Sequence, residues 1–211
     1  MATKAFYEKL VAWAKTYEVG VVSDLAYGAL GYQGYENPSF LSTPGAKDVG
    51  IEFYTFSKTF NMAGWRLAFA AGNDQMIEAL NLIQDHLFVG IFPALQEAGI
   101  AALLDPKSEE VVAQLNATYD SRRDAFVQAA AKIGWQAFPS RGSFYAWMPV
   151  PEGYTSESFA DLLLEKVHVA VAPGKGFGPA GDAYVRIGLL VEPERLVEAV
   201  DRIANLHLFN N

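Results

Sequence analysis

The sequence has no cysteine, three histidines and fewer basic than acidic residues. Without cysteine, neither a disulfide framework nor a thiolate metal site can form, which fits a reducing compartment. The histidines, at positions 86, 168 and 207, lack the spacing of metal ligands, so we expect no metal site. Sixteen Lys and Arg against 24 Asp and Glu give a net charge of −8, with no dense basic run. This balance argues against a nucleic-acid partner.

Long apolar runs and a leader pattern are also lacking. The N-terminal segment MATKAFYEKL does not have the charged-then-apolar layout of a secretory signal. No uncharged apolar run approaches the roughly 18 residues that span a bilayer. We therefore expect a soluble, cytoplasmic protein without membrane contact. Core-forming residues are abundant instead: 51% of the 211 residues are hydrophobic and 13% aromatic, enough for one or two folded domains.

The first half alternates helical and strand patterns. Apolar residues recur at helical spacing from Phe6 to Tyr17, and a β-branched run, 19–22, then leads to Ser23 and Asp24. Two further apolar segments, 51–56 and 66–71, are typical of strands, and helical periodicity resumes at Asn73. This order predicts an α/β arrangement with a mostly parallel sheet.

The second half begins with a long helical pattern. Asp105 precedes a proline and is a candidate N-cap for a helix of about seven turns that ends near Ile133. Short strands are then predicted at 135–138, 143–147, 167–171 and 183–187, with a helix over roughly 156–166. The last helix starts at Pro193 and places apolar residues and His207 on one face. These elements predict a small α+β unit, and we place the boundary inside the long helix, giving domains 1–118 and 119–211.

Three short segments carry candidate chemistry: Ser23–Tyr27, Thr55–Arg66 and Tyr184–Gly188. Lys58 lies among Tyr54, Phe56, Phe60 and Trp65. Apolar surroundings disfavour a charged amine, and imine formation needs the neutral form. A solvated surface lysine is the simpler alternative.

The residues around Lys58 could also bind an anion. In an extended segment, Thr55 and Ser57 share a face, so both hydroxyls could point at one anion. Arg66 could add a planar guanidinium fork, which suits a phosphate. For Asp24 and Tyr27 the simple alternatives are a turn residue and an aromatic at the rim of a core. For Arg186, on an alternating strand, the alternative is an exposed salt bridge.

Together, Asp24-x-x-Tyr27, Ser57-Lys58 and Gly64-Trp-Arg66 resemble the fold-type I pyridoxal-phosphate enzymes, specifically the class I/II aminotransferases. The resemblance implies a C-terminal half of such a chain. Residues 1–118 would be part of the mostly parallel-sheet large domain that binds the cofactor, and 119–211 the small α+β C-terminal domain.

The resemblance also implies a role for each residue. Asp24 would keep the cofactor's pyridine nitrogen protonated, and Tyr27 would donate to the ring's phenolic oxygen. Lys58 would form the Schiff base with pyridoxal 5'-phosphate and later transfer the substrate proton. Ser57 and Arg66, with Thr55 as a weaker candidate, would hold the phosphate.

A substrate contact is implied in the second half. Arg186 would bind the substrate's α-carboxylate through bidentate hydrogen bonds. The segment Ala172–Gly178 resembles the family's loop between the last strands, but a flexible glycine turn explains it as well, and we assign it no ligand.

The implied reaction is transamination between an amino acid and a 2-oxo acid, within amino-acid metabolism and biosynthesis, by a homodimer. The family's N-terminal half has no counterpart here, so the chain could be inactive alone. Two alternatives stay open: a pyridoxal-phosphate-dependent carbon-sulfur lyase of the same fold, and a non-catalytic, truncated aminotransferase-like domain. The sequence does not indicate which amino acid is the substrate.

Overall fold

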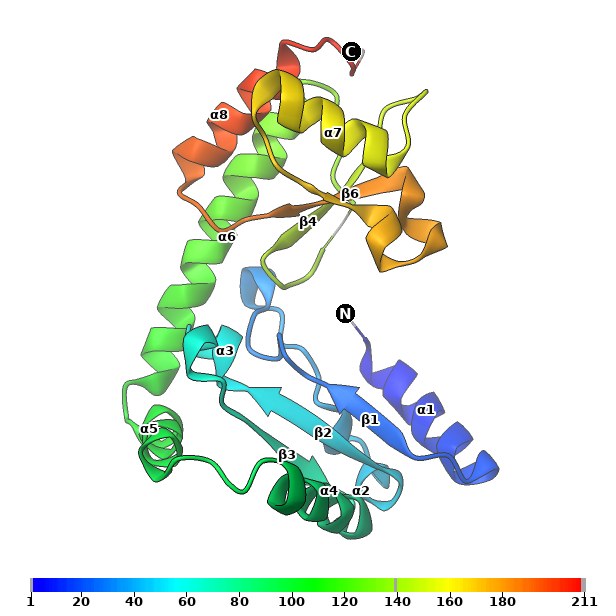
Figure 1. The fold of residues 1–211 in the computed structure, drawn as a ribbon, viewed down its shortest axis with the longest axis vertical. Coiled ribbons are helices and arrows are strands. Elements are labelled where there is room, and N and C mark those ends of the chain that lie inside the picture. The colour runs from blue at the N-terminus through cyan, green and yellow to red at the C-terminus, as the bar shows by residue number, and fades with distance from the viewer. Residues whose placement is uncertain (1, 139, 210–211) are drawn as a thin grey trace. The chain divides into compact units, whose positions relative to one another are not determined.

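The computed structural model describes residues 2–138 and 140–209, and the chain forms two compact units, Met1–Leu115 and Asn116–Asn211. Helix α6 (Ser108–Lys132) contributes to both (Figure 1). Its 25 residues form the seven-turn helix that the sequence predicts. Within the described residues, no helix combines the length and apolar character that crossing a bilayer requires.

The first unit is built on a three-stranded sheet in the order β1-β2-β3 (Figure 1). The strands are β1 (Val21–Asp24), β2 (Gly50–Thr55) and β3 (Ala68–Gly72). β1 and β2 are parallel, whereas β2 and β3 are antiparallel. The connection from β2 to β3 holds only the short turns α3 (Phe56–Thr59) and η3 (Ala63–Trp65), so the chain reverses direction instead of crossing over. The expectation of a mostly parallel sheet therefore describes β1 and β2 but not β3.

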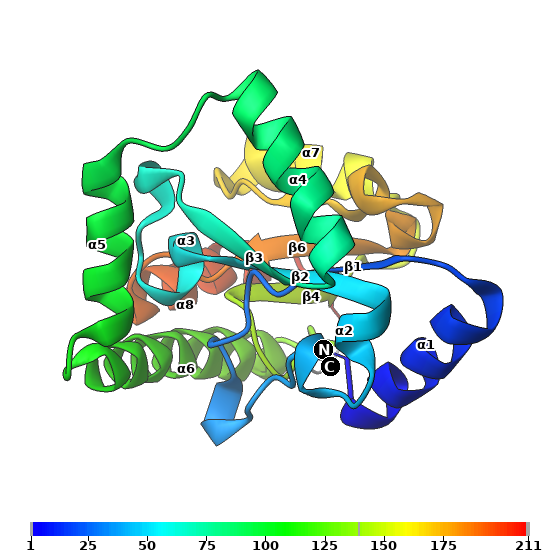
Figure 2. The ribbon, with the colours of Figure 1, turned by 90° about the horizontal axis from the view of Figure 1, so that it is seen from below.

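Helices flank this sheet. Figure 2 shows α4 (Asp74–Leu87) across one face, with α1 (Lys4–Tyr17) and the short α2 (Ala46–Val49) toward the other. α1 starts where Thr3 Oγ1 accepts a hydrogen bond from the Phe6 amide at 3.2 Å. α4 starts in the same way at Asn73, as its periodicity predicts.

Helix α5 (Pro93–Leu104) has no counterpart in the sequence predictions. Its sequence, PALQEAGIAALL, is apolar on nearly every side, so no helical period stands out. Gly99 is its one buried residue. A Cβ at this position would lie 2.7 Å from Leu67 Cδ2 and 3.2 Å from Phe56 Cζ, so the helix packs closely here against both side chains.

The second unit has its own antiparallel sheet, in the order β4-β6-β5. The strands are β4 (Tyr145–Pro149), β5 (Ala172–Pro173) and β6 (Tyr184–Gly188). Helices α7 (Ser156–Val167), α8 (Pro193–Ala204) and the C-terminal part of α6 pack against it around one core (Figure 1). The most buried large side chains of that core are Phe126, Trp135, Met148, Phe159, Leu163, Val185, Leu189, Val200 and Ile203.

Two predicted strands of this unit are wrong. Residues 135–138 form no strand: Trp135 turns into the core and its Nε1 donates to the Pro149 carbonyl at 2.7 Å, while the Phe138 amide donates to the Trp147 carbonyl at 2.9 Å. The predicted strand at 167–171 is also absent, because Val167 is the last residue of α7, His168 ends that helix in the left-handed conformation, and β5 starts only at Ala172.

Two predicted helix ends are also wrong. α6 begins at Ser108, not at an Asp105 cap; Asp105 ends α5, and its Oδ1 accepts from the Lys107 amide at 2.8 Å. α8 ends at Ala204, so His207 lies beyond it, in a left-handed conformation.

Candidate functional site

The predicted cofactor residues of the first unit lie at one edge of its sheet. Asp24 ends β1 and pairs with Phe53, two residues before β2 ends at Thr55. Because the two strands are parallel, their carboxyl ends share an edge, which is where ligands bind in open α/β sheets. Beyond Asp24 the chain turns, and the Asp24 carboxylate accepts a hydrogen bond from the Ala26 amide at 3.2 Å.

A cavity of about 270 Å³ opens at this turn. Its lining includes Asp24, Tyr27 and Asn37, together with Ala2, Tyr7, Leu25 and Pro38. Asn37 holds the turn, since its Nδ2 donates to the carbonyls of Tyr27 at 3.0 Å, Gly28 at 3.2 Å and Leu30 at 3.3 Å. Its Oδ1 is buried and has no hydrogen-bond partner among the described residues. A buried acceptor without a partner, at a cavity, is suited to a ligand's donor.

Lys58 follows β2 in the single turn of α3 and is half-buried. Thr55 caps this turn, because its Oγ1 accepts from the Ser57 amide at 3.1 Å. The Thr55 and Ser57 hydroxyl oxygens are 3.0 Å apart. The two hydroxyls thus lie close together, as the sequence predicts. The predicted extended conformation is wrong, because Ser57 lies in the helical turn α3.

Aromatic rings pack beside this turn. Phe56 lies 5.8 Å from Phe60 and 6.0 Å from Phe69 between ring centroids, and Tyr54 lies 5.3 Å from Phe69. The Tyr54 hydroxyl donates to Thr59 Oγ1 at 2.8 Å. Trp65, expected in the same setting, is 47% exposed.

Arg66 lies at the same edge of the sheet. It directly follows η3 and precedes β3, whose first residue, Ala68, pairs with Thr55. Arg66 adopts the left-handed conformation with φ 53°, which is uncommon for a non-glycine residue. Its side chain is exposed and donates to the Ala63 carbonyl at 3.0 Å.

A buried carboxylate beneath this edge was missed from the sequence. Glu52, in the middle of β2, is 6% exposed. It accepts hydrogen bonds from Ser23 Oγ at 3.0 Å, Ser39 Oγ at 2.5 Å and the Phe40 amide at 2.7 Å. Glu52 thereby ties β2 to β1 and to the segment after the Asp24 turn. The available signal was a charged residue inside an otherwise apolar strand pattern.

Arg186, the predicted substrate residue, belongs to the second unit. It lies in β6, opposite Trp147 of β4. Its guanidinium carbon is 4.1 Å from the ring centroid of Tyr145 and 4.3 Å from that of Phe177. Guanidinium groups stack favourably on aromatic faces, and this leaves their N–H groups available for a carboxylate.

No group of three or more histidine, aspartate or glutamate side chains is arranged as a metal site within residues 2–138 and 140–209. The donor set at the sheet edge consists instead of a carboxylate, hydroxyls, an amine and a guanidinium. Such a set suits an organic phosphate with a protonated ring nitrogen better than it suits a metal ion.

Comparison with known proteins matches residues 1–203 to the family described as aminotransferase class I and II. An L-glutamine--4-(methylsulfanyl)-2-oxobutanoate aminotransferase of Bacillus subtilis is 56% identical over 209 residues, covering 99% of this chain and 52% of that protein. An LL-diaminopimelate aminotransferase of Moorella thermoacetica is 45% identical over 203 residues, covering 96% of this chain and 52% of that protein. The solved apo-BacF structure from Bacillus subtilis matches with a TM-score of 0.94 at 44% identity, covering 100% of this chain and 54% of that one. The chain spans about half the length of these relatives.

Proposed function

We propose that this chain, which belongs to the family of class I and II aminotransferases, is the C-terminal half of a pyridoxal-phosphate-dependent transaminase. It has the fold-type I aminotransferase fold. Residues 1–118 are then part of the large cofactor-binding domain, and residues 119–211 form the small domain. The reaction exchanges an amino group between an amino acid and a 2-oxo acid. One observation carries the proposal: the pairing of β1, β2 and β3 brings Asp24, Ser57, Lys58 and Arg66 to one edge of one sheet.

The residues at this edge fit the cofactor. Pyridoxal phosphate, when bound, supplies an electron sink for the electron pair left as the substrate loses its α-proton. The Asp24 carboxylate holds a proton on the pyridine nitrogen, because an adjacent negative charge favours the protonated ring. Tyr27, in the turn that Asn37 holds, donates to the ring's phenolic oxygen. Asn37 lines the same cavity as Asp24 and Tyr27.

The remaining residues hold the phosphate and move the proton. The hydroxyl of Ser57, supported by that of Thr55, and the Arg66 guanidinium bind the phosphate oxygens. Lys58 holds the cofactor covalently through its amine. The Lys58 amine, when free, would take the proton from the substrate Cα and deliver it to the cofactor carbon. Arg186 binds the substrate α-carboxylate with its N–H groups.

Covalent attachment to Lys58 is testable on the chain itself. We expect pyridoxal phosphate followed by borohydride to leave one stable label, which peptide mass spectrometry places at Lys58. Lys58→Ala should lose this label together with the imine absorption, whereas Lys47→Ala, at an exposed lysine of α2, should keep both. Equal labelling of Lys58→Ala and the parent chain would contradict the proposal. No site-specific label in any of these proteins would favour the non-catalytic, truncated domain.

The reaction type needs a second assay. Because the Bacillus subtilis relative is named for glutamine and 4-(methylsulfanyl)-2-oxobutanoate, these two compounds are the first donor and acceptor to test. We expect amino transfer from glutamine to the oxo acid, in this chain or in a longer protein that contains it. Pyruvate release from a thioether amino acid without amino transfer would support the carbon-sulfur lyase instead.

The setting of the enzyme is part of the same proposal. We expect a homodimer in the cytoplasm that serves amino-acid biosynthesis. The absence of cysteine supports a reducing compartment, and the family resemblance supports the dimer.

A further inference from the structure

The loop between β5 and β6 is packed tightly, although its many glycines suggest a flexible turn. It consists of two short turns, η4 (Gly174–Phe177) and η5 (Pro179–Ala183). A Cβ on Gly174 would lie 2.1 Å from the Gly181 carbonyl oxygen, and a Cβ on Gly181 would lie 2.1 Å from the Gly174 carbonyl oxygen. The backbones of the two turns therefore touch at a place where only glycine fits.

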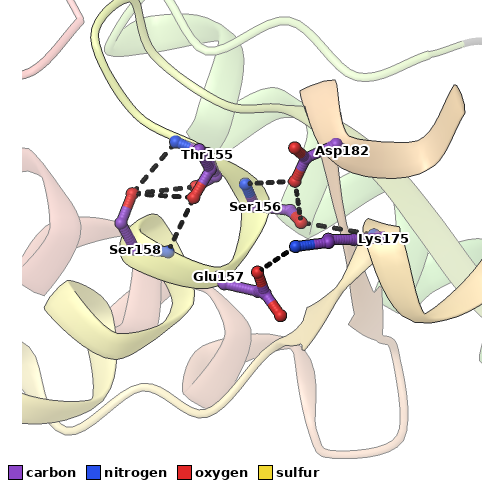
Figure 3. Close-up of polar contacts among 6 residues, drawn as sticks. All are labelled: Thr155, Ser156, Glu157, Ser158, Lys175 and Asp182. Atoms are coloured by element: carbon purple, nitrogen blue, oxygen red, sulfur yellow. Dashed lines mark hydrogen bonds and ion pairs between the residues drawn. The ribbon is translucent and has the colours of Figure 1, made fainter. Parts of the chain in front are cut away.

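A buried serine fastens this loop to helix α7. Ser156, the first residue of α7, is fully buried. Its amide and its hydroxyl both donate to Asp182 Oδ1, at 3.2 and 2.8 Å, and its Oγ accepts from the Lys175 amide at 3.2 Å (Figure 3). One hydroxyl thus joins both turns to the helix. An exposed ion pair, Lys175 Nζ to Glu157 Oε2 at 2.6 Å, reinforces the link, and this hydrogen bond raises the pKa of Lys175 above its usual value.

The fastened loop carries Phe177 to the candidate substrate arginine. Phe177 is 54% exposed, so its ring is not fixed by burial. Instead the ring lies against the Arg186 guanidinium, at 4.3 Å, and edge-on to Trp147, with ring centroids 5.9 Å apart. Tyr145, from β4, contacts the same guanidinium at 4.1 Å. Phe177 is the one of these two rings that comes from the loop, so the loop's position determines whether it reaches Arg186.

We propose that Ser156 and Asp182 are positioning residues for substrate binding: they fix the 174–183 loop so that Phe177, with Tyr145, orients the Arg186 guanidinium toward a carboxylate. This inference rests on the proposed role of Arg186. An arginine side chain that is already ordered loses less rotamer freedom when it binds a ligand. The fastened loop thus raises affinity for the carboxylate without touching it.

The test uses the whole chain and follows the Arg186 Nε–Hε group by ¹⁵N NMR, assigned with Arg186→Lys, during titration with 2-oxoglutarate. In the parent chain we expect an ordered Arg186 side chain whose resonance shifts on titration. Ser156→Ala, Asp182→Ala and Phe177→Ala should each make that side chain mobile. They should weaken binding roughly tenfold, since one immobilised side chain is worth about an order of magnitude in affinity.

Conservative variants separate positioning from general damage. Asp182→Asn keeps an acceptor oxygen and Phe177→Tyr keeps a ring, so both should restore order and most of the affinity. Thr155→Ala removes the neighbouring helix cap, in which Oγ1 accepts from the Ser158 amide at 3.2 Å, without touching the loop. It should therefore leave Arg186 unchanged.

Two outcomes would overturn the inference, and they differ from each other. If Arg186 stays ordered and binds normally in Asp182→Ala and Phe177→Ala, the positioning role is wrong while the proposed function stands. If Arg186 of the parent chain does not respond to 2-oxoglutarate at all, its proposed substrate role fails, and this inference fails with it.

Discussion

The two units of the molecule bury their apolar residues to very different extents. The second unit encloses large side chains such as Trp135, Phe159 and Met148 in one continuous core. In the first unit, the cluster around Val11, Phe40 and Ala46 is small. Helix α4 buries no residue fully and α5 buries only Gly99. The second unit therefore has one continuous core, whereas α4 and α5 of the first unit leave nearly all their apolar residues at least partly exposed.

The most exposed large apolar residues of the first unit lie between the end of α4 and the end of α5. Leu87, Phe88, Val89 and Phe92 are between 66% and 87% exposed at the end of α4 and in the link to α5, and Leu104 at the end of α5 is 77% exposed. Apolar surface of this kind marks a place where another surface binds. Within the first unit, polar contacts of Glu52 and Asn37 hold the segments around the candidate cofactor site. The exposed apolar side chains of α4 and α5 are instead suited to packing against another surface.

The largest effect is expected from a substitution in the closed core. Trp135 is 1% exposed, its ring lies 5.0 Å from that of Phe209 and 5.9 Å from that of Phe159, and its Nε1 donates to the Pro149 carbonyl at 2.7 Å. Trp135→Ala should lower the free energy of unfolding of the second unit by about 3–5 kcal/mol, the usual cost of removing a buried aromatic. Denaturant titration followed by amide NMR separates the units.

Trp65→Ala provides the matched control for this experiment. Trp65 is 47% exposed in the first unit, and its loss should cost less than half as much. If both substitutions lowered the free energy of unfolding equally, the two units would not differ in how strongly their apolar residues are buried.

A smaller but still substantial effect is expected at Glu52. Glu52→Ala leaves the donors of Ser23, Ser39 and Phe40 without their acceptor. Removing an acceptor from buried donors should destabilise the first unit by roughly 2–4 kcal/mol. Glu52→Gln, which keeps one acceptor oxygen, should lose less. The comparison predicts that protection of amides from hydrogen exchange falls in β1 and β2 and is unchanged in β4 and β6; a uniform fall would show that the two units unfold together.

The sequence predicts the elements that have a clear period or that lie near known motifs. Helices α4, α6 and α7 and the strands β1, β2, β3, β4 and β6 follow from apolar repeats and turn residues. α5 was missed because an all-apolar helix has no amphipathic face to detect. The false strand at 135–138 arose because a buried Trp135 beside apolar residues has the same local pattern as a short strand.

The candidate site was predictable where it is local in sequence. Ser57, Lys58 and Arg66 come from one segment, and the strand before Asp24 was recognisable. The contacts that hold the candidate residues join segments that are apart in the sequence: Glu52 to Ser23 in the first unit, and Arg186 to Tyr145 in the second. No single-sequence pattern reports such pairs, because each partner alone has an ordinary local explanation.

The smallest change in stability is expected from substitutions at the end of α4 and in the link to α5. These substitutions also test whether the apolar residues there are exposed in solution. Leu87→Gln with Phe92→Gln replaces side chains that are 70% and 69% exposed. Such surface substitutions should change the free energy of unfolding by no more than about 0.5 kcal/mol each, while binding of a hydrophobic dye should fall because apolar surface is lost. Leu163→Gln makes the same change at a fully buried position of α7 and should destabilise strongly, because it places an amide in a core without partners. Two results would contradict this expectation: Leu87→Gln and Phe92→Gln lower the free energy of unfolding as much as Leu163→Gln does, or the free energy of unfolding of the parent chain rises with protein concentration. Either result would show that these apolar residues are already covered by another molecule in solution.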